Sequence, residues 1–217
     1  MNKIIDINSL LEFYKKAYFP MADSKHSEEV KFYKPKIRFI IPISEFRYPK
    51  KLFNNFKKTK YFFRVNYNFH KVIKLCREVE RKDNDTWIND IILNTYIKLY
   101  ELGKCHSIEC YENDELIGGL YGLHIGSCFF GESMFSLKTN TSKYCLLYLL
   151  AILKKNNFSL LDSQFYNHHL LQFGALEIES SLYENKLINS LEKESFFKNI
   201  DNFQEVLSLI QSNSQRS

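Results

Sequence analysis

The sequence is poor in residues that crosslink a chain or interrupt its regular structure. Its 217 residues include seven glycines, four prolines and five cysteines, and no two cysteines form a C-x-x-C pair. We therefore expect reduced cysteines rather than a disulfide framework. No uncharged apolar run reaches 18 residues, and the first residues, MNKIIDINSLLEFYKK, lack the apolar segment of a signal peptide. We expect a soluble, cytoplasmic protein without a membrane partner.

Apolar and aromatic side chains, in contrast, are abundant. Hydrophobic residues make up 45% of the chain and aromatic residues 16%, which indicates a globular protein with a sizeable core. The length allows one large domain or a small lobe attached to a larger one. We expect a small N-terminal lobe over residues 1–60, a main lobe over 61–212 and a disordered tail over 213–217.

Positive charge is modest in total but unevenly distributed. The net charge is +5, yet the stretch from Phe46 to Arg64 has seven basic residues, seven aromatic residues and no acid. Basic residues between aromatic ones suit a phosphate backbone whose bases stack on the rings. A lysine-rich surface whose aromatic side chains face the core would have the same composition. Both interpretations remain open at this point.

The order of the predicted elements indicates an α/β protein with a mixed sheet. Residues 105–125 alternate like a hairpin with a turn at Glu112–Asp114, and Asp85 or Thr86 and Gly103 bound a predicted helix. Apolar spacing predicts further helices over 9–20, 68–80, 140–157 and 182–193 and strands over 37–43, 126–133 and 158–164. It also predicts a helix followed by a strand within 168–179, and turn residues predict a loop over 21–36.

Two carboxylates interrupt apolar runs that read as strands. Glu132 follows GSCFFG, and Asp162 follows FSLL with Gln164 next to it on the same predicted strand face. A buried charge costs several kcal/mol unless it is paired, so each acid is a satisfied structural group or part of a polar site. Five of the seven glycines lie between Gly118 and Gly131. They indicate bulges in a bent sheet, or close approach of another backbone or a ligand.

Several kinds of site are disfavoured by spacing. His168 and His169 are adjacent and their side chains diverge, and the potential ligands between Cys105 and Cys110 alternate between two strand faces. GESMF is not a G-x-S-x-G nucleophile motif, and the glycines match neither a Walker A loop nor a dinucleotide fingerprint. We therefore expect neither a metal site nor a covalent intermediate.

Four stretches in order, DTWINDIILNTYIKLYELGKCHSIECY, LIGGLYGLHIGSCFFGESMFS, NTSKYCLLYLLAIL and LLDSQFYNHHLLQFGALEI, closely resemble the motifs of bacterial leucyl/phenylalanyl-tRNA–protein transferases. LLEFYKKAYFPMA resembles the N-terminal segment of that family. The resemblance implies an acetyltransferase-like (GNAT-type) main lobe with a small N-terminal lobe. It also implies transfer of Leu, Phe or Met from aminoacyl-tRNA to proteins that begin with Arg or Lys. Such transfer marks the acceptor for N-end rule degradation, and no cofactor is implied.

The resemblance assigns roles to individual residues. Asp162 and Gln164 correspond to the proposed catalytic pair, and Glu132 to the residue that holds the reacting end of the aminoacyl-adenosine. A carboxylate could take or relay the proton that the attacking amine loses. The other implied groups are an aminoacyl-adenosine set, Trp87, Phe32, Tyr33 and Ser133; a side-chain pocket, Leu120, Phe129, Met134, Leu146, Leu149, Leu153 and Leu161; and a tRNA track, Lys50, Lys51, Lys57, Lys58, Lys60 and Arg64.

The chain departs from the family pattern at three places. KFYKP has no tryptophan, the segment from Arg47 to Pro49 replaces a His-x-Ser motif, and Glu179 and Ser180 follow Ile178 where many members have I-P-R. The last change removes a cation, so a leucyl transferase that acts on N-terminal Asp or Glu remains an alternative. A non-catalytic tRNA-binding protein is another. An acetyltransferase is disfavoured because no pyrophosphate loop is recognisable.

Overall fold

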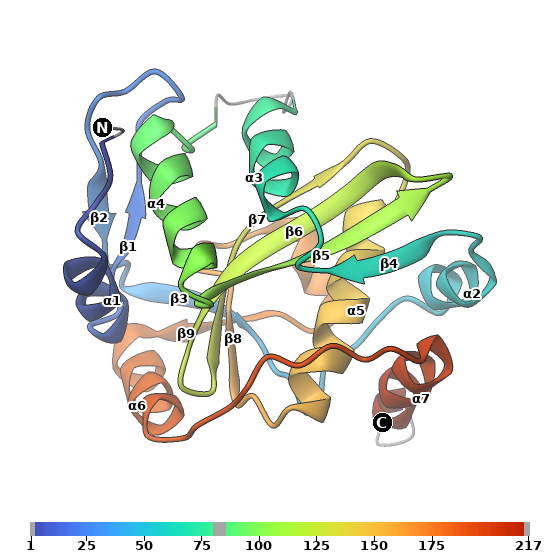
Figure 1. The fold of residues 1–217 in the computed structure, drawn as a ribbon. Coiled ribbons are helices and arrows are strands. Elements are labelled where there is room, and N and C mark those ends of the chain that lie inside the picture. Colours follow the sequence, from blue (N-terminus) through green and yellow to red (C-terminus); the bar gives the residue numbers. More distant parts are fainter. Residues whose placement is uncertain (1–2, 80–85, 215–217) are drawn as a thin grey trace.

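A mixed sheet with helices on both faces forms the centre of the molecule (Figure 1). The computed structural model describes residues 3–79 and 86–214. In the described residues the sheet has seven strands in the order β4-β5-β6-β7-β8-β3-β9. Their bounds are β3 Ile37–Ile41, β4 Phe62–Val65, β5 Cys105–Glu112, β6 Glu115–Ile125, β7 Cys128–Ser136, β8 Leu160–Asp162 and β9 Leu176–Glu179. The predicted α/β class with a mixed sheet is confirmed.

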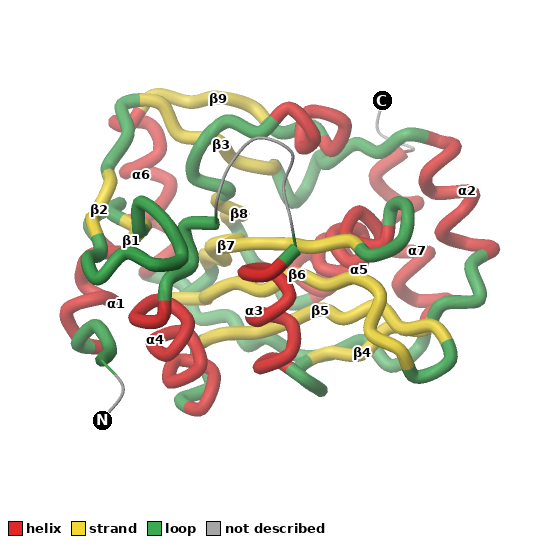
Figure 2. Tube along the Cα trace, turned by 90° about the horizontal axis from the view of Figure 1, so that it is seen from above, coloured by secondary structure: helices red, strands yellow, loops and turns green. Residues whose placement is uncertain are grey.

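Two apolar cores lie on opposite faces of this sheet. One packs α2, α5 and α7 against it, and the other packs α1, α3, α4 and α6. Figure 2 shows α3 and α4 crossing one face while α5 and α7 lie behind the strands. The helices are α1 Ile7–Lys15, α2 Lys50–Lys58, α3 Phe69–Glu78, α4 Asp90–Glu101, α5 Thr141–Lys155, the 3-10 helix η1 His168–Phe173, α6 Ser180–Leu191 and α7 Phe203–Ser214.

The central hairpin and the long helix form as predicted. Strands β5 and β6 pair in antiparallel fashion around a turn in which Asn113 and Asp114 both have positive φ, as a tight hairpin turn requires. Gly103 has φ of 70° after α4, so its predicted position beyond the helix end is confirmed. At Gly122 a Cβ would lie 2.3 Å from the carbonyl oxygen of Phe130. That glycine therefore permits the close approach of β7 at a register shift.

The N-terminal segment differs from the prediction. Helix α1 ends at Lys15 rather than at Pro20, because Ala17 adopts φ of 68° and turns the chain. A short strand β1 (Phe19–Met21) follows, and it pairs with β2 (Lys31–Tyr33) inside the predicted loop. Strands of three residues depend on their partner rather than on their own apolar pattern. The sequence therefore held no signal for them.

Two element boundaries are also corrected. The N-cap of α4 is Asn89, whose side chain accepts a hydrogen bond from the backbone of Ile92, and not Thr86. Asp85, the other predicted cap, lies outside the described residues. Helix α7 continues to Ser214, so residues 213 and 214 are helical rather than part of a disordered tail, and the rest of that tail is not described.

The sheet crosses the predicted boundary at residue 60. Strand β3 belongs to the segment that we assigned to an N-terminal lobe, yet it lies between β8 and β9. It pairs with both in antiparallel fashion, for example Ile40 with Asp162 and Ile40 with Leu176. The other elements of that segment, α1, the β1–β2 pair and α2, lie outside the seven-stranded sheet.

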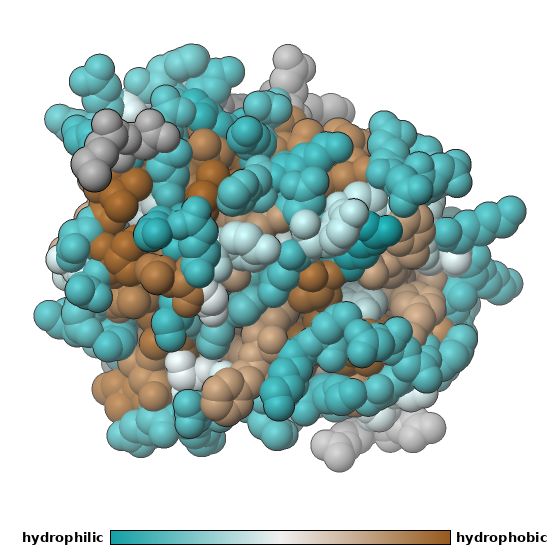
Figure 3. Space-filling view, viewed as in Figure 1, coloured by the Kyte–Doolittle hydropathy of each residue, from teal (hydrophilic) through white to brown (hydrophobic). Residues whose placement is uncertain are grey.

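Helix α2 explains the composition of the basic stretch. Its apolar residues Leu52, Phe53 and Phe56 are buried, as is Phe46 just before it. These aromatic rings therefore pack into the core and are not free to stack on bases. The lysines of the stretch lie on the outside of the helix, and Figure 3 shows hydrophilic side chains along the edge where Figure 1 places α2.

Candidate active site

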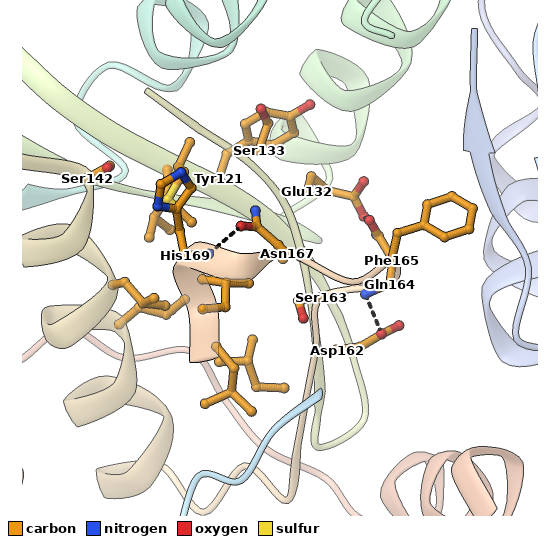
Figure 4. A pocket seen from close by; sticks show the side chains of 18 of the residues that line it. Tyr121, Glu132, Ser133, Ser142, Asp162, Ser163, Gln164, Phe165, Asn167 and His169 are labelled. Carbon is orange, nitrogen blue, oxygen red and sulfur yellow. Dashed lines mark hydrogen bonds between the residues drawn. The ribbon is translucent and has the colours of Figure 1, made fainter. Parts of the chain in front are cut away.

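The site lies where two parallel strands separate. β7 and β8 pair from Cys128–Leu160 to Phe130–Asp162, after which β7 continues along β6 to Ser136. The chain after β8 instead stays beside β3, because the backbone of Phe39 accepts from Ser163 N and donates to Gln164 O. A cavity of about 750 Å³ occupies the opening between them (Figure 4).

The cavity brings most of the predicted site residues together. Its polar side includes Glu132, Asp162 and Gln164, the three predicted catalytic residues. Trp87 and Ser133 of the predicted adenosine set also line it. The apolar lining contains five members of the predicted side-chain pocket, Leu120, Met134, Leu146, Leu149 and Leu161.

Four residues that we predicted for the adenosine set or the side-chain pocket do not line this cavity. Phe129 and Leu153 are completely buried in the core on the α5 face and do not line the cavity. Phe32 stacks on Phe13 with ring centroids 4.2 Å apart. Tyr33 is closer to the site, since its ring contacts that of Phe165 (6.2 Å), which does line the cavity.

Sequence reasoning missed a group of lining residues on segments without a predicted role. They come from β1, from the beginning of α5, from the loop after β8 and from the start of η1, and include Pro20, Met21, Ser142, Lys143, Phe165, Tyr166, Asn167 and His169. The loop residues directly follow the D-x-Q motif, and Phe165 and Tyr166 are aromatic yet exposed. Two aromatic residues next to a polar motif were a signal that could have identified this rim.

Glu132 is held by neutral donors. Its Oε1 accepts hydrogen bonds from the Tyr14 hydroxyl (2.7 Å) and the Gln164 side-chain amide (3.2 Å). The Tyr96 hydroxyl in turn contacts that of Tyr14, which extends the chain of hydroxyl groups. Burial raises the pKa of Glu132 to about 7, against the opposing effect of the Tyr14, Tyr96 and Gln164 hydrogen bonds. Near neutral pH this carboxyl group therefore exists in both protonation states.

Asp162 has an opposite environment. The side chain has no exposed surface, and Arg38 donates from Nε to Oδ1 (2.9 Å) and from Nη2 to Oδ2 (2.5 Å). The Tyr183 hydroxyl donates to Oδ2 (2.7 Å) and the backbone of Gln164 to Oδ1 (2.8 Å). This is a two-point arginine–carboxylate pair, the arrangement with the strongest hydrogen bonds.

Arg38 is itself held by a backbone carbonyl and by two aromatic rings. Its Nη1 donates to the carbonyl of Ala17 (3.0 Å), and its guanidinium lies over the rings of Phe19 (4.6 Å) and Tyr183 (4.5 Å). Burial lowers the pKa of Arg38, but attraction to the Asp162 carboxylate outweighs it and the pKa lies above its ordinary value. Arg38 therefore keeps its positive charge beside the Asp162 carboxylate.

Gln164 lies beyond the strand on which we predicted it. β8 ends at Asp162, and Gln164 adopts the left-handed conformation with φ of 64°. A residue other than glycine pays about 1–3 kcal/mol for such a conformation unless its surroundings enforce it. Here the Asp162 carboxylate binds the backbone N–H of Gln164, and Phe39 donates to its carbonyl. The result is that the side-chain amide points at Glu132.

The basic stretch lies near the cavity without entering it. The ring of Phe56 in α2 is 5.5 Å from that of Tyr144 in the first turn of α5. The adjacent residues Ser142 and Lys143 line the cavity. Helix α2 therefore packs beside the first turn of α5, the turn from which Ser142 and Lys143 line the cavity.

Neither metal ligation nor membrane insertion has support in the described residues. No group of three or more His, Cys, Asp or Glu side chains there is arranged to hold an ion. Within the same residues, no helix has the length and apolar character needed to cross a bilayer.

Comparisons with known proteins agree on one family. A family model described as leucyl/phenylalanyl-tRNA protein transferase matches residues 40–188. A leucyl/phenylalanyl-tRNA–protein transferase from Paramagnetospirillum magneticum is 40% identical over 87% of this chain and 90% of its own length. One of the same name from Zymomonas mobilis is 42% identical over 86% of this chain and 70% of its own length.

Similarity among solved structures is much weaker. A conserved protein of unknown function from Staphylococcus epidermidis has a TM-score of 0.40 at 11% identity, over 82% of this chain and 66% of its own. L-PGS from Bacillus licheniformis has a TM-score of 0.39 at 10% identity, over 96% and 70%. These scores are too low to assign the fold. The family match and the two relatives, in contrast, span most of the chain, and by them the chain belongs to the leucyl/phenylalanyl-tRNA–protein transferases, a family of aminoacyltransferases.

Proposed function

We propose that the protein transfers Leu, Phe or Met from aminoacyl-tRNA to the N-terminal amine of cytoplasmic proteins that begin with Arg or Lys. The transfer would mark those proteins for N-end rule degradation. The observation that carries the proposal is the cavity between β7 and β8, which combines an apolar wall with Glu132 and Gln164. This is the combination that an aminoacyl ester needs, because its side chain is apolar and its reacting end is polar.

The apolar wall supports selection of large aliphatic and aromatic side chains. Leu146 and Leu149 from α5 face Leu120, Met134 and Leu161 from the sheet across the cavity. An unbranched methionine adapts to either leucine or phenylalanine. Trp87 and Ser133 on the polar side would contact the terminal adenosine, consistent with the family resemblance.

The reaction requires positioning more than activation, since the ester linkage to tRNA is already reactive. The acceptor amine attacks the ester carbonyl carbon, a C–N bond forms, and the bond to the ribose oxygen breaks. In this proposal Gln164 orients the reacting groups, and Asp162 holds Gln164 in its left-handed conformation. Well-oriented reactants can gain about 7–11 kcal/mol from proximity alone.

The tRNA would lie along α2 with its acceptor end in the cavity. Support comes from the position of Lys57 and Lys58 on a helix that packs against Tyr144, next to cavity residue Lys143. Phosphate contacts of this kind position the nucleic acid, while the aminoacyl-adenosine is read inside the cavity. We also propose a GNAT-type main lobe, which the separated parallel pair β7–β8 within an otherwise antiparallel sheet supports.

The test is transfer of labelled leucine from Leu-tRNA to two peptides that differ in their first residue, Arg or Asp. Label on the Arg peptide alone is the expected result. Label on the Asp peptide would contradict the acceptor assignment and point to Glu179 and Ser180, which lie at the junction of β9 and α6. Binding of tRNA without transfer to either peptide would instead favour a non-catalytic tRNA-binding protein.

A further inference from the structure

We propose that Glu132, and not Asp162, accepts the proton that the attacking amine loses, and that Tyr14 and Tyr96 are positioning residues that hold Glu132 through a buried chain of hydroxyl groups. The inference deepens the proposed function and rests on it. It starts from the difference between the two carboxylates of the cavity in exposure, in hydrogen-bond donors and in charge.

Asp162 is not available as a proton acceptor. Its side chain has no exposed surface, and both of its oxygens accept hydrogen bonds from Arg38 and from either Tyr183 or the Gln164 backbone. A proton placed on either oxygen would displace one of these donors. It would also leave the buried guanidinium of Arg38 without a counter-charge, which is strongly unfavourable. Asp162 is therefore a positioning residue for Gln164.

Glu132 lacks such a counter-charge. None of the ion pairs formed by the described residues includes it. It is 8% exposed, lines the cavity, and shares its Oε1 with the amide of Gln164, the residue that Asp162 orients. A proton can therefore reach Glu132 from a group bound in the cavity without the loss of an ion pair.

The groups that surround Glu132 set the protonation state that it favours. Tyr14 comes from α1, Tyr96 from α4, Cys105 from β5 and Asp162 from β8. Burial raises the pKa values of Tyr14, Tyr96 and Cys105 well above their ordinary range, so these groups stay protonated and neutral. Burial raises the pKa of Glu132 itself to about 7. A group with a pKa near the working pH is suited to both accept and return a proton.

The proton balance of the reaction is then complete within the cavity. As the amine nitrogen bonds to the ester carbonyl carbon, one N–H proton passes to the Glu132 carboxylate. The bond from that carbon to the ribose oxygen then breaks. The departing oxygen takes the proton from the Glu132 carboxylic acid and becomes the hydroxyl group of the free tRNA, which restores the carboxylate for the next cycle.

Two matched Tyr→Phe variants test which of the two carboxylates accepts the proton. Tyr14→Phe removes a hydroxyl that donates to Glu132, and Tyr183→Phe removes one that donates to Asp162. Each keeps its ring, which packs on Phe130 (4.8 Å) or on Arg38 (4.5 Å). The measurement is the single-turnover rate of leucyl transfer to an Arg peptide between pH 5 and pH 9 for both variants and the wild type.

The wild-type rate is expected to fall below pH 8, where the acceptor amine becomes protonated, and to fall more steeply through the pKa of Glu132, about 7, so that the lower limb reports Glu132. Loss of the Tyr14 donor destabilises the carboxylate, so Tyr14→Phe is expected to move this limb upward by about one pH unit. Tyr96→Phe should move it less, and Tyr183→Phe should leave its position unchanged whatever happens to the maximal rate. The acceptor amine titrates near pH 8 in every variant and does not contribute to the difference. A limb that moves with Tyr183→Phe and not with Tyr14→Phe would overturn the inference in favour of Asp162.

A second measurement does not depend on transfer. In protein with ¹³C-labelled glutamate, one carboxyl resonance, assigned by its loss in Glu132→Gln, is expected to titrate near pH 7 and to shift upward in Tyr14→Phe. Titration of that resonance near 4.5, or no response to Tyr14→Phe, would overturn the inference. Titration as expected together with no transfer at any pH would overturn the proposed function instead.

Discussion

Glu132 and Asp162 show how differently one protein can bury two carboxylates. Asp162 forms an ion pair with Arg38, whereas Glu132 accepts from hydroxyl and amide donors and takes part in none of the ion pairs of the described residues. The first arrangement fixes geometry, and the second leaves a proton exchangeable near neutral pH. The different environments of the two acids thus assign them different tasks.

The raised pKa of Glu132 makes the charged form costly to the folded state. The folded pKa of about 7 exceeds the ordinary value of 4.5, so this group stabilises the fold below pH 4.5 and the stabilisation is lost as pH rises through 7. Glu132→Gln removes this dependence. Relative to wild type, its free energy of unfolding at pH 8 is expected to be greater by about 3 kcal/mol. Urea denaturation at pH 5 and pH 8 measures it, and an equal difference at both values would contradict the prediction.

The Arg38–Asp162 pair is expected to couple strongly in unfolding. Asp162→Ala leaves a buried guanidinium unpaired, and Arg38→Met leaves a buried carboxylate, so each should cost about 3–5 kcal/mol. The double variant should cost clearly less than the two together, because no lone charge remains. Denaturation of the four proteins in a double-mutant cycle provides the measurement. Additive losses would mean that the pair contributes no net interaction. For activity, Asp162→Asn is the better variant because it keeps the volume.

The acids of the site could be predicted from the sequence, but their partners could not. Glu132 and Asp162 stand out because a charge inside an apolar run demands an explanation. Tyr14 and Arg38 do not stand out, since a tyrosine on an amphipathic helix and an arginine in a strand are common. Their roles depend on contacts across 118 and 124 residues of sequence. Gln164 was identified but placed on a strand, because nothing in its neighbours indicates a left-handed conformation.

At the scale of elements, only part of one face of α5 forms a wall of the cavity. Leu146 and Leu149 reach the cavity, whereas Leu153, one turn further along, is enclosed by the core. We predicted all three as pocket residues from the family resemblance, and helical spacing places them on a common stripe. Sequence spacing alone does not reveal where along that stripe the neighbouring strands separate. That position depends on β8 ending at Asp162.

Leucines of α5 therefore provide a matched pair for the pocket. Leu149→Ala should enlarge the cavity and lower the Leu/Phe preference in transfer by about tenfold, the lower end of what one methylene contributes to discrimination. Leu153→Ala should destabilise the fold by about 2–5 kcal/mol without altering that preference. Competition between Leu-tRNA and Phe-tRNA measures the ratio. An unchanged ratio in Leu149→Ala would remove this residue from the pocket.

The elements that we predicted correctly are mainly those that are long and have a strong apolar pattern. The hairpin of β5 and β6 and the helix α5 are long and strongly patterned, and both were correct. The basic stretch, in contrast, gave no helix prediction although it forms α2, since its composition drew attention to charge rather than to period. The buried faces of Phe53 and Phe56 have the 3-residue spacing of an amphipathic helix.

At the scale of the molecule, α2 exposes four lysines, Lys50, Lys51, Lys57 and Lys58. Reversal of Lys57 and Lys58 to Glu should weaken tRNA binding and lower the slope of log affinity against log salt by at least about 2, because two phosphate contacts are lost. Lys71 and Lys74 of α3 form a matched control on the opposite face of the sheet, where both are exposed. Filter binding of Leu-tRNA at several salt concentrations gives the slopes. Equal effects of the two double variants would exclude a track along α2.

The hydrogen bond from Tyr14 to Glu132 and the pair of Arg38 with Asp162 also determine when in the life of the chain a working site can exist. Both join the first fifth of the sequence to its last half, and Tyr183 completes the second. Contacts so distant along the chain form late, after the closure of long loops. During synthesis the N-terminal helix emerges long before its partners. A ribosome-bound chain shorter than about 183 residues thus lacks the assembled site.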